Sequence, residues 1–152
     1  MESAATPGKR RIAKPLGVYV ITAFDGIFIG LVPLILLLVL DNDTSINISE
    51  FDYYVTAALR IIVVAAALGA VMGENLGRRI LLLAVTAVSI SMILNSVGFL
   101  TSSQESGAQG VGLVGNITRG VFWIAINWWY FNRKGVADYY RQNRDTQVQN
   151  TS

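Results

Sequence analysis

Four apolar stretches, each long enough to cross a lipid bilayer as a helix, constrain this chain more than any other feature. They cover residues 16–40, 54–72, 80–100 and 111–131. A transmembrane helix needs about 20 predominantly apolar residues. None of the stretches alternates apolar and polar residues as a barrel strand does. Lipid supplies no hydrogen-bond partners for the backbone, and a helix satisfies these groups internally. The sequence therefore predicts an all-α membrane protein with four transmembrane helices.

The composition agrees with a lipid environment and excludes several kinds of site. Hydrophobic residues make up 53% and charged residues 14% of the 152 residues, against roughly 25% charged residues in an average soluble domain. The chain has no cysteine and no histidine, so disulfides, thiolate nucleophiles, imidazole bases and most zinc or haem sites are excluded. We find no catalytic motif, and we expect neither an enzyme nor a bound metal or cofactor.

The first stretch follows several basic residues and must therefore be compared with a secretory signal peptide. Its apolar run is longer than the roughly 7–15 residues of a signal peptide. It ends in a run of leucine and valine, residues 36–40, that contains no site for a signal peptidase. We predict a retained transmembrane helix, kinked at Pro33.

Lysine and arginine are distributed very unevenly between the connections. Ten of the twelve fall before the first stretch, between the second and third, or after the fourth: Lys9, Arg10, Arg11, Lys14, Arg78, Arg79, Arg133, Lys134, Arg141 and Arg144. The connections at 41–53 and 101–110 contain none. By the positive-inside rule both termini are cytoplasmic, and the basic excess reports topology rather than nucleic-acid binding.

These features divide the chain into three parts. Residues 1–15 form a basic cytoplasmic segment, residues 16–131 an antiparallel four-helix transmembrane bundle, and residues 132–152 a basic, partly disordered tail. We expect a short surface helix after Gly135 and disorder from about Asn143. The fourth helix ends in residues suited to anchoring it at the headgroup level, namely Trp128, Trp129, Tyr130, Arg133 and Lys134.

Three short motifs mark the helix ends: KPLGV at residues 14–18, GENLGRR at 73–79 and YFNRKGV at 130–136. Together they resemble the corresponding segments of small prokaryotic four-helix membrane proteins of unassigned function. The resemblance implies a multi-pass protein of a prokaryotic plasma membrane with no known reaction. It supplies no catalytic residues.

Charged residues within the apolar stretches are costly and suggest a site. At 1.5 Å per residue, Asp25 lies about 14 Å from the cytoplasmic edge, and Arg60 and Arg119 lie about 18 Å from it. We expect the three to meet near the midplane, with Asn127 on the same stripe of the fourth helix as Arg119. Two interpretations stay open. The cluster binds an anion or relays protons through Asp25, or it is an internal ion pair with one arginine extending outward.

Glycines at helical spacing indicate close helix packing, within the chain or between chains. Gly26 and Gly30 form one such step, and Gly69 and Gly73 form another. Gly77 continues the second series, but its position favours a loop glycine.

The pattern as a whole predicts a non-enzymatic accessory or assembly subunit of a membrane complex. Its partners would be the lipid bilayer and either another membrane protein or a second copy of the chain. The alternative is a small oligomeric transporter or channel with its site at Asp25, Arg60 and Arg119.

Overall fold

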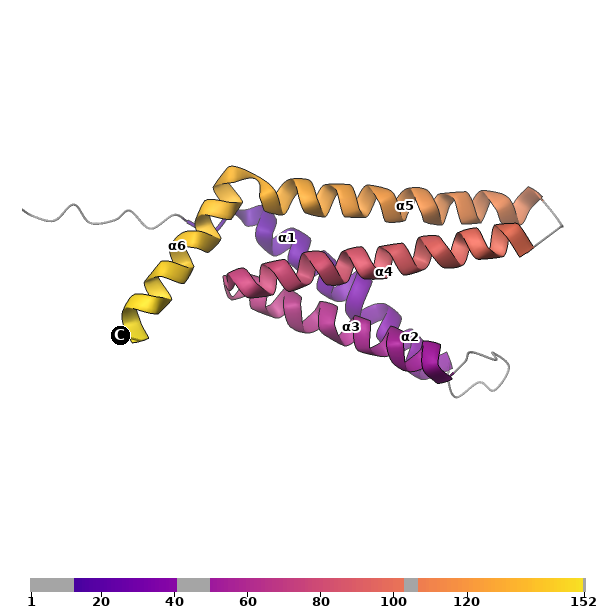
Figure 1. The fold of residues 1–152 in the computed structure, drawn as a ribbon, viewed down its shortest axis with the longest axis horizontal. Helices are drawn as coiled ribbons and strands as arrows, with labels where there is room; N and C mark the ends of the chain where they lie inside the picture. Colours follow the sequence, from indigo (N-terminus) through magenta and orange to yellow (C-terminus); the bar gives the residue numbers. More distant parts are fainter. Residues whose placement is uncertain (1–12, 41–49, 103–106, 152) are drawn as a thin grey trace, which may run out of the picture.

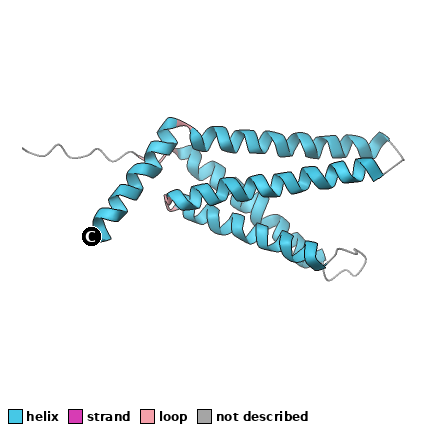
Figure 2. Ribbon diagram, viewed as in Figure 1, coloured by secondary structure: helices cyan, strands magenta, loops and turns pink. Residues whose placement is uncertain are grey.

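The computed structural model describes residues 13–40, 50–102 and 107–151, and nearly all of these residues lie in helices (Figure 2). The prediction of an all-α fold is confirmed. The elements are α1 (Leu16–Phe24), the π-helical segment η1 (Asp25–Leu31), α2 (Val32–Leu40), α3 (Glu50–Val71), α4 (Asn75–Ser102), α5 (Gly107–Asn132) and α6 (Lys134–Thr151). Because α1, η1 and α2 follow one another without a break, they form a single continuous helical stretch.

Three of the helical stretches are long and apolar enough to cross a membrane: Leu16–Val39, Asp52–Val71 and Asn75–Val97. They fit a multi-pass membrane protein. The fourth predicted span, 111–131, lies within α5, which is not one of these three over the residues described. This helix carries Asn116, Arg119 and Asn127, and these polar side chains lower its mean hydropathy.

The helices form two antiparallel pairs that meet at one end of the molecule (Figure 1). The first pair is α1–η1–α2 with α3, and the second is α4 with α5. A short turn at residues 72–74 joins α3 to α4, and we call the end that carries it the turn end. Away from this end α3 and α4 diverge, while α5 continues alongside α4.

The buried apolar core is concentrated toward the turn end. It consists of Val18, Val63, Ala66, Ala67, Ala70, Leu81, Leu82, Ala84, Val85, Val88, Phe131, Val136 and Tyr140. Many large apolar side chains elsewhere on the helices are exposed. Such a surface is compatible with lipid, in which exposed apolar groups carry no hydration penalty.

The turn between α3 and α4 depends on Gly73. Its φ of +87° is unfavourable for residues with a Cβ atom. The N–H of Gly73 donates to the carbonyl of Ala70 (3.1 Å), and the N–H of Glu74 donates to that of Gly69 (3.0 Å). This pair of bonds is the Schellman motif, which ends α3 and lets α4 begin at Asn75. Gly73 is therefore a turn residue rather than part of a helix-packing stripe.

The close contact between α3 and α4 is made by Gly69 and Gly77. A Cβ atom on Gly77 would lie 2.6 Å from the carbonyl carbon of Gly69 and 2.6 Å from the nitrogen of Ala70. Interpreting Gly77 as a loop glycine was wrong, because α4 begins before it and backbone contacts backbone there. Gly69 therefore does pack closely against another helix, as the sequence predicted, and its partner is Gly77 of α4.

The helices extend further than the apolar stretches do. α3 begins at Glu50 and α4 at Asn75, several residues before the starts expected at 54 and 80. α6 continues to Thr151, where we expected a short helix and then disorder from about Asn143. Val136 and Tyr140 bury the first half of α6 in the core, and adding residues to an existing helix costs little.

Candidate functional site

Asp25, at the start of η1, is a fully buried carboxyl group with 0% of its surface exposed. Its Oδ1 accepts a hydrogen bond from the indole Nε1 of Trp123 (2.7 Å) and a longer one from Nδ2 of Asn127 (3.4 Å). Trp123 and Asn127 lie one turn apart on α5. The structure thus brings Asp25 and Asn127 together, and it adds Trp123 as the shorter contact.

The surroundings of Asp25 fix this arrangement and leave one oxygen unused. The ring of Phe24 packs against that of Trp123 at 4.5 Å between centroids, and Asn127 also donates to the carbonyl of Trp123 (3.2 Å). The other carboxyl oxygen, Oδ2, is buried and has no hydrogen-bond partner among the described residues. A buried polar atom without a partner is costly and suggests either a structural compromise or a function.

Arg60, on α3, binds a backbone carbonyl of the first helical stretch rather than a carboxylate. Its NH1 donates to the carbonyl oxygen of Ile29 at 2.6 Å. In an α-helix this carbonyl would accept from the residue four positions later, which here is Pro33 and has no N–H. Arg60 therefore supplies this carbonyl with the donor that Pro33 lacks.

The effect of Pro33 extends to the helical register. The N–H of Val32 donates to the carbonyl of Ile27, five residues earlier, and η1 ends just before it. The sequence predicted a kink at Pro33, and the described feature is this widened π-helical turn. A proline in one apolar stretch and an arginine in the next were both visible in the sequence, but nothing there indicated that they face each other.

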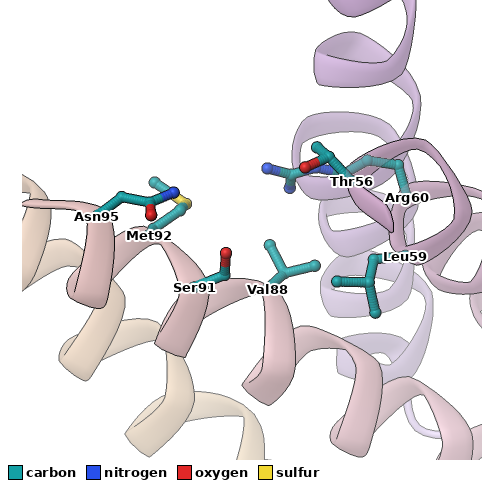
Figure 3. Close-up of a pocket in the computed structure, with 7 residues that line it drawn as sticks. All are labelled: Thr56, Leu59, Arg60, Val88, Ser91, Met92 and Asn95. Atoms are coloured by element: carbon teal, nitrogen blue, oxygen red, sulfur yellow. The ribbon is translucent and has the colours of Figure 1, made fainter. Parts of the chain in front are cut away.

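Arg60 also lines a small polar cavity of about 80 Å³ between α3 and α4, which we call the Arg60 slot (Figure 3). The slot is formed by Thr56, Leu59, Arg60, Val88, Ser91, Met92 and Asn95. Among these described residues, no hydrogen bond joins one polar side chain to another, and the Nε of Arg60 is buried without a partner. The slot was not predicted from the sequence.

Arg119 occupies a third, separate environment. It is exposed on α5, and none of the residues that the structure describes pairs with it. No ion pair joins Asp25, Arg60 and Arg119 within this part of the chain. The three charged residues therefore do not meet. Asp25 is hydrogen-bonded to α5, Arg60 caps a backbone carbonyl, and Arg119 is exposed.

Two glycines of the first helical stretch, Gly26 and Gly30, face α3. A Cβ atom on Gly26 would lie 3.1 Å from that of Ala67, and one on Gly30 would lie 2.6 Å from Cγ2 of Val64. This step therefore serves packing within the chain and brings η1 close enough to α3 for Arg60 to reach Ile29.

The predicted anchor residues near the end of α5 are partly exposed and partly in contact with other segments of the chain. Trp128 donates from Nε1 to the hydroxyl of Thr86 (2.9 Å). Trp129 is 66% exposed, with the guanidinium of Arg133 at 5.7 Å from its ring. Tyr130 packs over Gly17, and Lys134 is exposed.

Four side chains cap helix carbonyls at the turn end, a role that was not predicted from the sequence. Tyr140 donates to Ala70 (2.9 Å), Asn143 to Gly73 (2.9 Å), Arg78 to Phe131 (3.0 Å), and Lys14 to Val71. Carbonyls at helix C-termini lack intrahelical donors, so these contacts satisfy them. Burial raises the pKa of Tyr140, which keeps its hydroxyl protonated as a donor.

Comparison of the chain with known protein families, with curated proteins and with solved structures finds no match. The chemistry must therefore be argued from the residues themselves. Asp25 offers a carboxyl group in a dry environment, and the Arg60 slot offers cationic and neutral donors. The described residues contain no group of three or more metal-ligating side chains.

Proposed function

We propose that this chain is a four-span protein of a prokaryotic plasma membrane, with both termini cytoplasmic, and that it is a non-enzymatic accessory subunit of a membrane complex. Contacts at the turn end support the topology. Lys14 reaches Val71 and Arg78 reaches Phe131, so the predicted cytoplasmic ends of all four spans lie together. The resemblance of the helix-end motifs to prokaryotic proteins supports the location.

Arg119 is the observation that carries the accessory role. It is exposed about 18 Å from the turn end of α5 by helical rise, and the exposed ring of Phe122 lies one turn away on the same side of the helix. A guanidinium that faces lipid at this depth is costly. A partner that offers a carboxylate or free carbonyl would remove the cost, so we infer that this face of α5 contacts another membrane protein or a second copy.

Purification of the full chain from its native host in mild detergent, followed by mass spectrometry of the co-eluting proteins, tests this role. We expect a stoichiometric membrane partner, or a dimer, that is lost in Arg119→Gln. Arg133→Gln, which removes an exposed arginine at the turn end, should keep it. A monomeric particle of this chain alone would overturn the proposal.

A small oligomeric transporter or channel is the second candidate. The Oδ2 of Asp25, which no described residue bonds, favours it. A buried carboxyl group that can gain and lose a proton is common in membrane transport. Asp25→Asn keeps the shape of the side chain and removes its charge. A transporter should lose flux in reconstituted vesicles, whereas an accessory subunit should lose only stability.

A further inference from the structure

We propose that the Arg60 slot binds a single phosphate-type anion, and that its surroundings favour the headgroup phosphate of an anionic lipid. The slot lies between α3 and α4 in the part of the molecule where these helices diverge (Figures 1 and 3). This inference goes beyond the accessory role and depends only on the placement of α3 and α4 in a membrane.

The charge of the slot selects an anion. Among the described residues that line it, Arg60 is the one with a charge, and none is an aspartate or a glutamate. Its bond to Ile29 holds one arm of the guanidinium in place, so the group is oriented before a ligand arrives. A guanidinium fork matches the oxygen geometry of a phosphate and forms strong, charge-assisted hydrogen bonds.

Neutral donors face this charge from both helices. Thr56 lies one turn from Arg60 on α3, and Ser91 and Asn95 lie one turn apart on α4. Polar side chains that join two membrane helices normally bond to each other. Here no hydrogen bond crosses the slot between the described residues, so their hydroxyl and amide groups are available to a ligand.

The size of the slot suits one compact group. A volume of about 80 Å³ has room for more than one water molecule, since each needs about 10–15 Å³ of such space, and therefore for one phosphate group. The apolar lining, from Leu59, Val88 and Met92, suits the glycerol and chain of a lipid better than a fully hydrated ion.

The test measures lipid retained by the full chain alone, without any partner. Protein taken from vesicles of phosphatidylcholine with a minor fraction of phosphatidylglycerol is examined by native mass spectrometry. We expect wild-type protein to retain phosphatidylglycerol preferentially. Arg60→Gln should reduce the preference about tenfold, equivalent to about 1.4 kcal/mol. Arg141→Gln removes an exposed arginine of α6, outside the slot, and is the control.

A second variant separates ligand binding from folding. Ser91→Leu fills the slot from α4 without removing the bond between Arg60 and Ile29, and it should lose the same preference. If Arg60→Gln fails to fold, this variant decides alone. Competition by inorganic phosphate would support the site with a free anion as its source.

Unchanged retention of phosphatidylglycerol in Ser91→Leu would overturn the proposal, and so would an equal loss in Arg141→Gln. Neither result depends on whether a protein partner is found. Failure of the lipid site and failure of the accessory role are therefore distinguishable.

Discussion

The two halves of the α3–α4 pair differ in whether their polar groups are hydrogen-bonded within the described residues. At the turn end, Gly69 and Gly77 bring the backbones into contact, and side chains from other segments cap the carbonyls of Ala70 and Gly73. In the Arg60 slot the same two helices diverge, and polar side chains face each other without bonding.

The difference separates groups that hold the fold together from groups available for binding. Donors at the turn end are used by the backbone carbonyls that α3 and α5 leave at their C-termini. The hydroxyl and amide groups of Thr56, Ser91 and Asn95 have no such use within the described residues. Arg60 belongs to both categories, because one arm caps Ile29 and its Nε finds no partner in the part of the chain that the structure describes.

The largest effect is expected from widening the contact at the turn end. Gly77→Ala places a methyl group 2.6 Å from backbone atoms of α3, and these cannot move aside as a side chain could. We expect a loss of about 2–3 kcal/mol in the free energy of unfolding, at the upper end for overpacking. Thermal unfolding in detergent, followed by circular dichroism, measures it.

The matched control for this change is Gly115→Ala on α5. A Cβ atom there would meet nothing within 4 Å, and alanine favours the helix by up to about 1 kcal/mol over glycine. Equal unfolding temperatures for the two variants would show that the α3–α4 contact is looser than described.

The hydrogen bond between Trp123 and Asp25 should cost somewhat less to break than the contact at Gly77. Trp123→Phe keeps an aromatic ring against Phe24 but removes the 2.7 Å donor to Asp25. Leaving a buried acceptor with only the longer bond from Asn127 should cost about 1–3 kcal/mol. Trp129→Phe, at an exposed position, is the control, and an equal shift in both unfolding curves would contradict the role of this bond.

A smaller effect is expected from one cap at the turn end. Tyr140→Phe removes only the hydroxyl that donates to Ala70 (2.9 Å), which should cost about 0.5–1.5 kcal/mol. Tyr54→Phe removes a hydroxyl from an exposed tyrosine and should change little. Hydrogen exchange of the last turn of α3 should increase in Tyr140→Phe, and unchanged protection there would argue against a capping role.

The sequence predicted the helices well because apolar length alone determines them. All four apolar stretches lie within or almost wholly within helices, and Asp25 and Asn127, singled out by their cost in lipid, lie together. Helix ends were less predictable. The first turns of α3 and α4, which begin at Glu50 and Asn75, contain polar residues, and a hydropathy pattern does not detect these as helical. Four membrane crossings and the cytoplasmic termini stay predictions.

The rest of the site depended on geometry between helices. Which face of α3 meets η1 decides whether Arg60 reaches Asp25 or Ile29, and a rotation of one residue on a helix changes the direction by about 100°. The serine and asparagine of the slot are ordinary residues in sequence. Their position opposite Arg60, across the gap between α3 and α4, is visible only in the structure.

The smallest effect is expected in the slot itself, and it completes the comparison. Asn95→Ala removes an exposed amide that no described residue bonds, so the free energy of unfolding should change by less than about 0.5 kcal/mol. Asn127→Ala removes the same group where it is 1% exposed and bonded to Asp25, and should cost about 1–3 kcal/mol. Thermal unfolding in detergent compares the two variants directly. A loss in Asn95→Ala as large as that in Asn127→Ala would mean that the slot holds the helices together. It would then no longer differ from the turn end in how it uses polar groups.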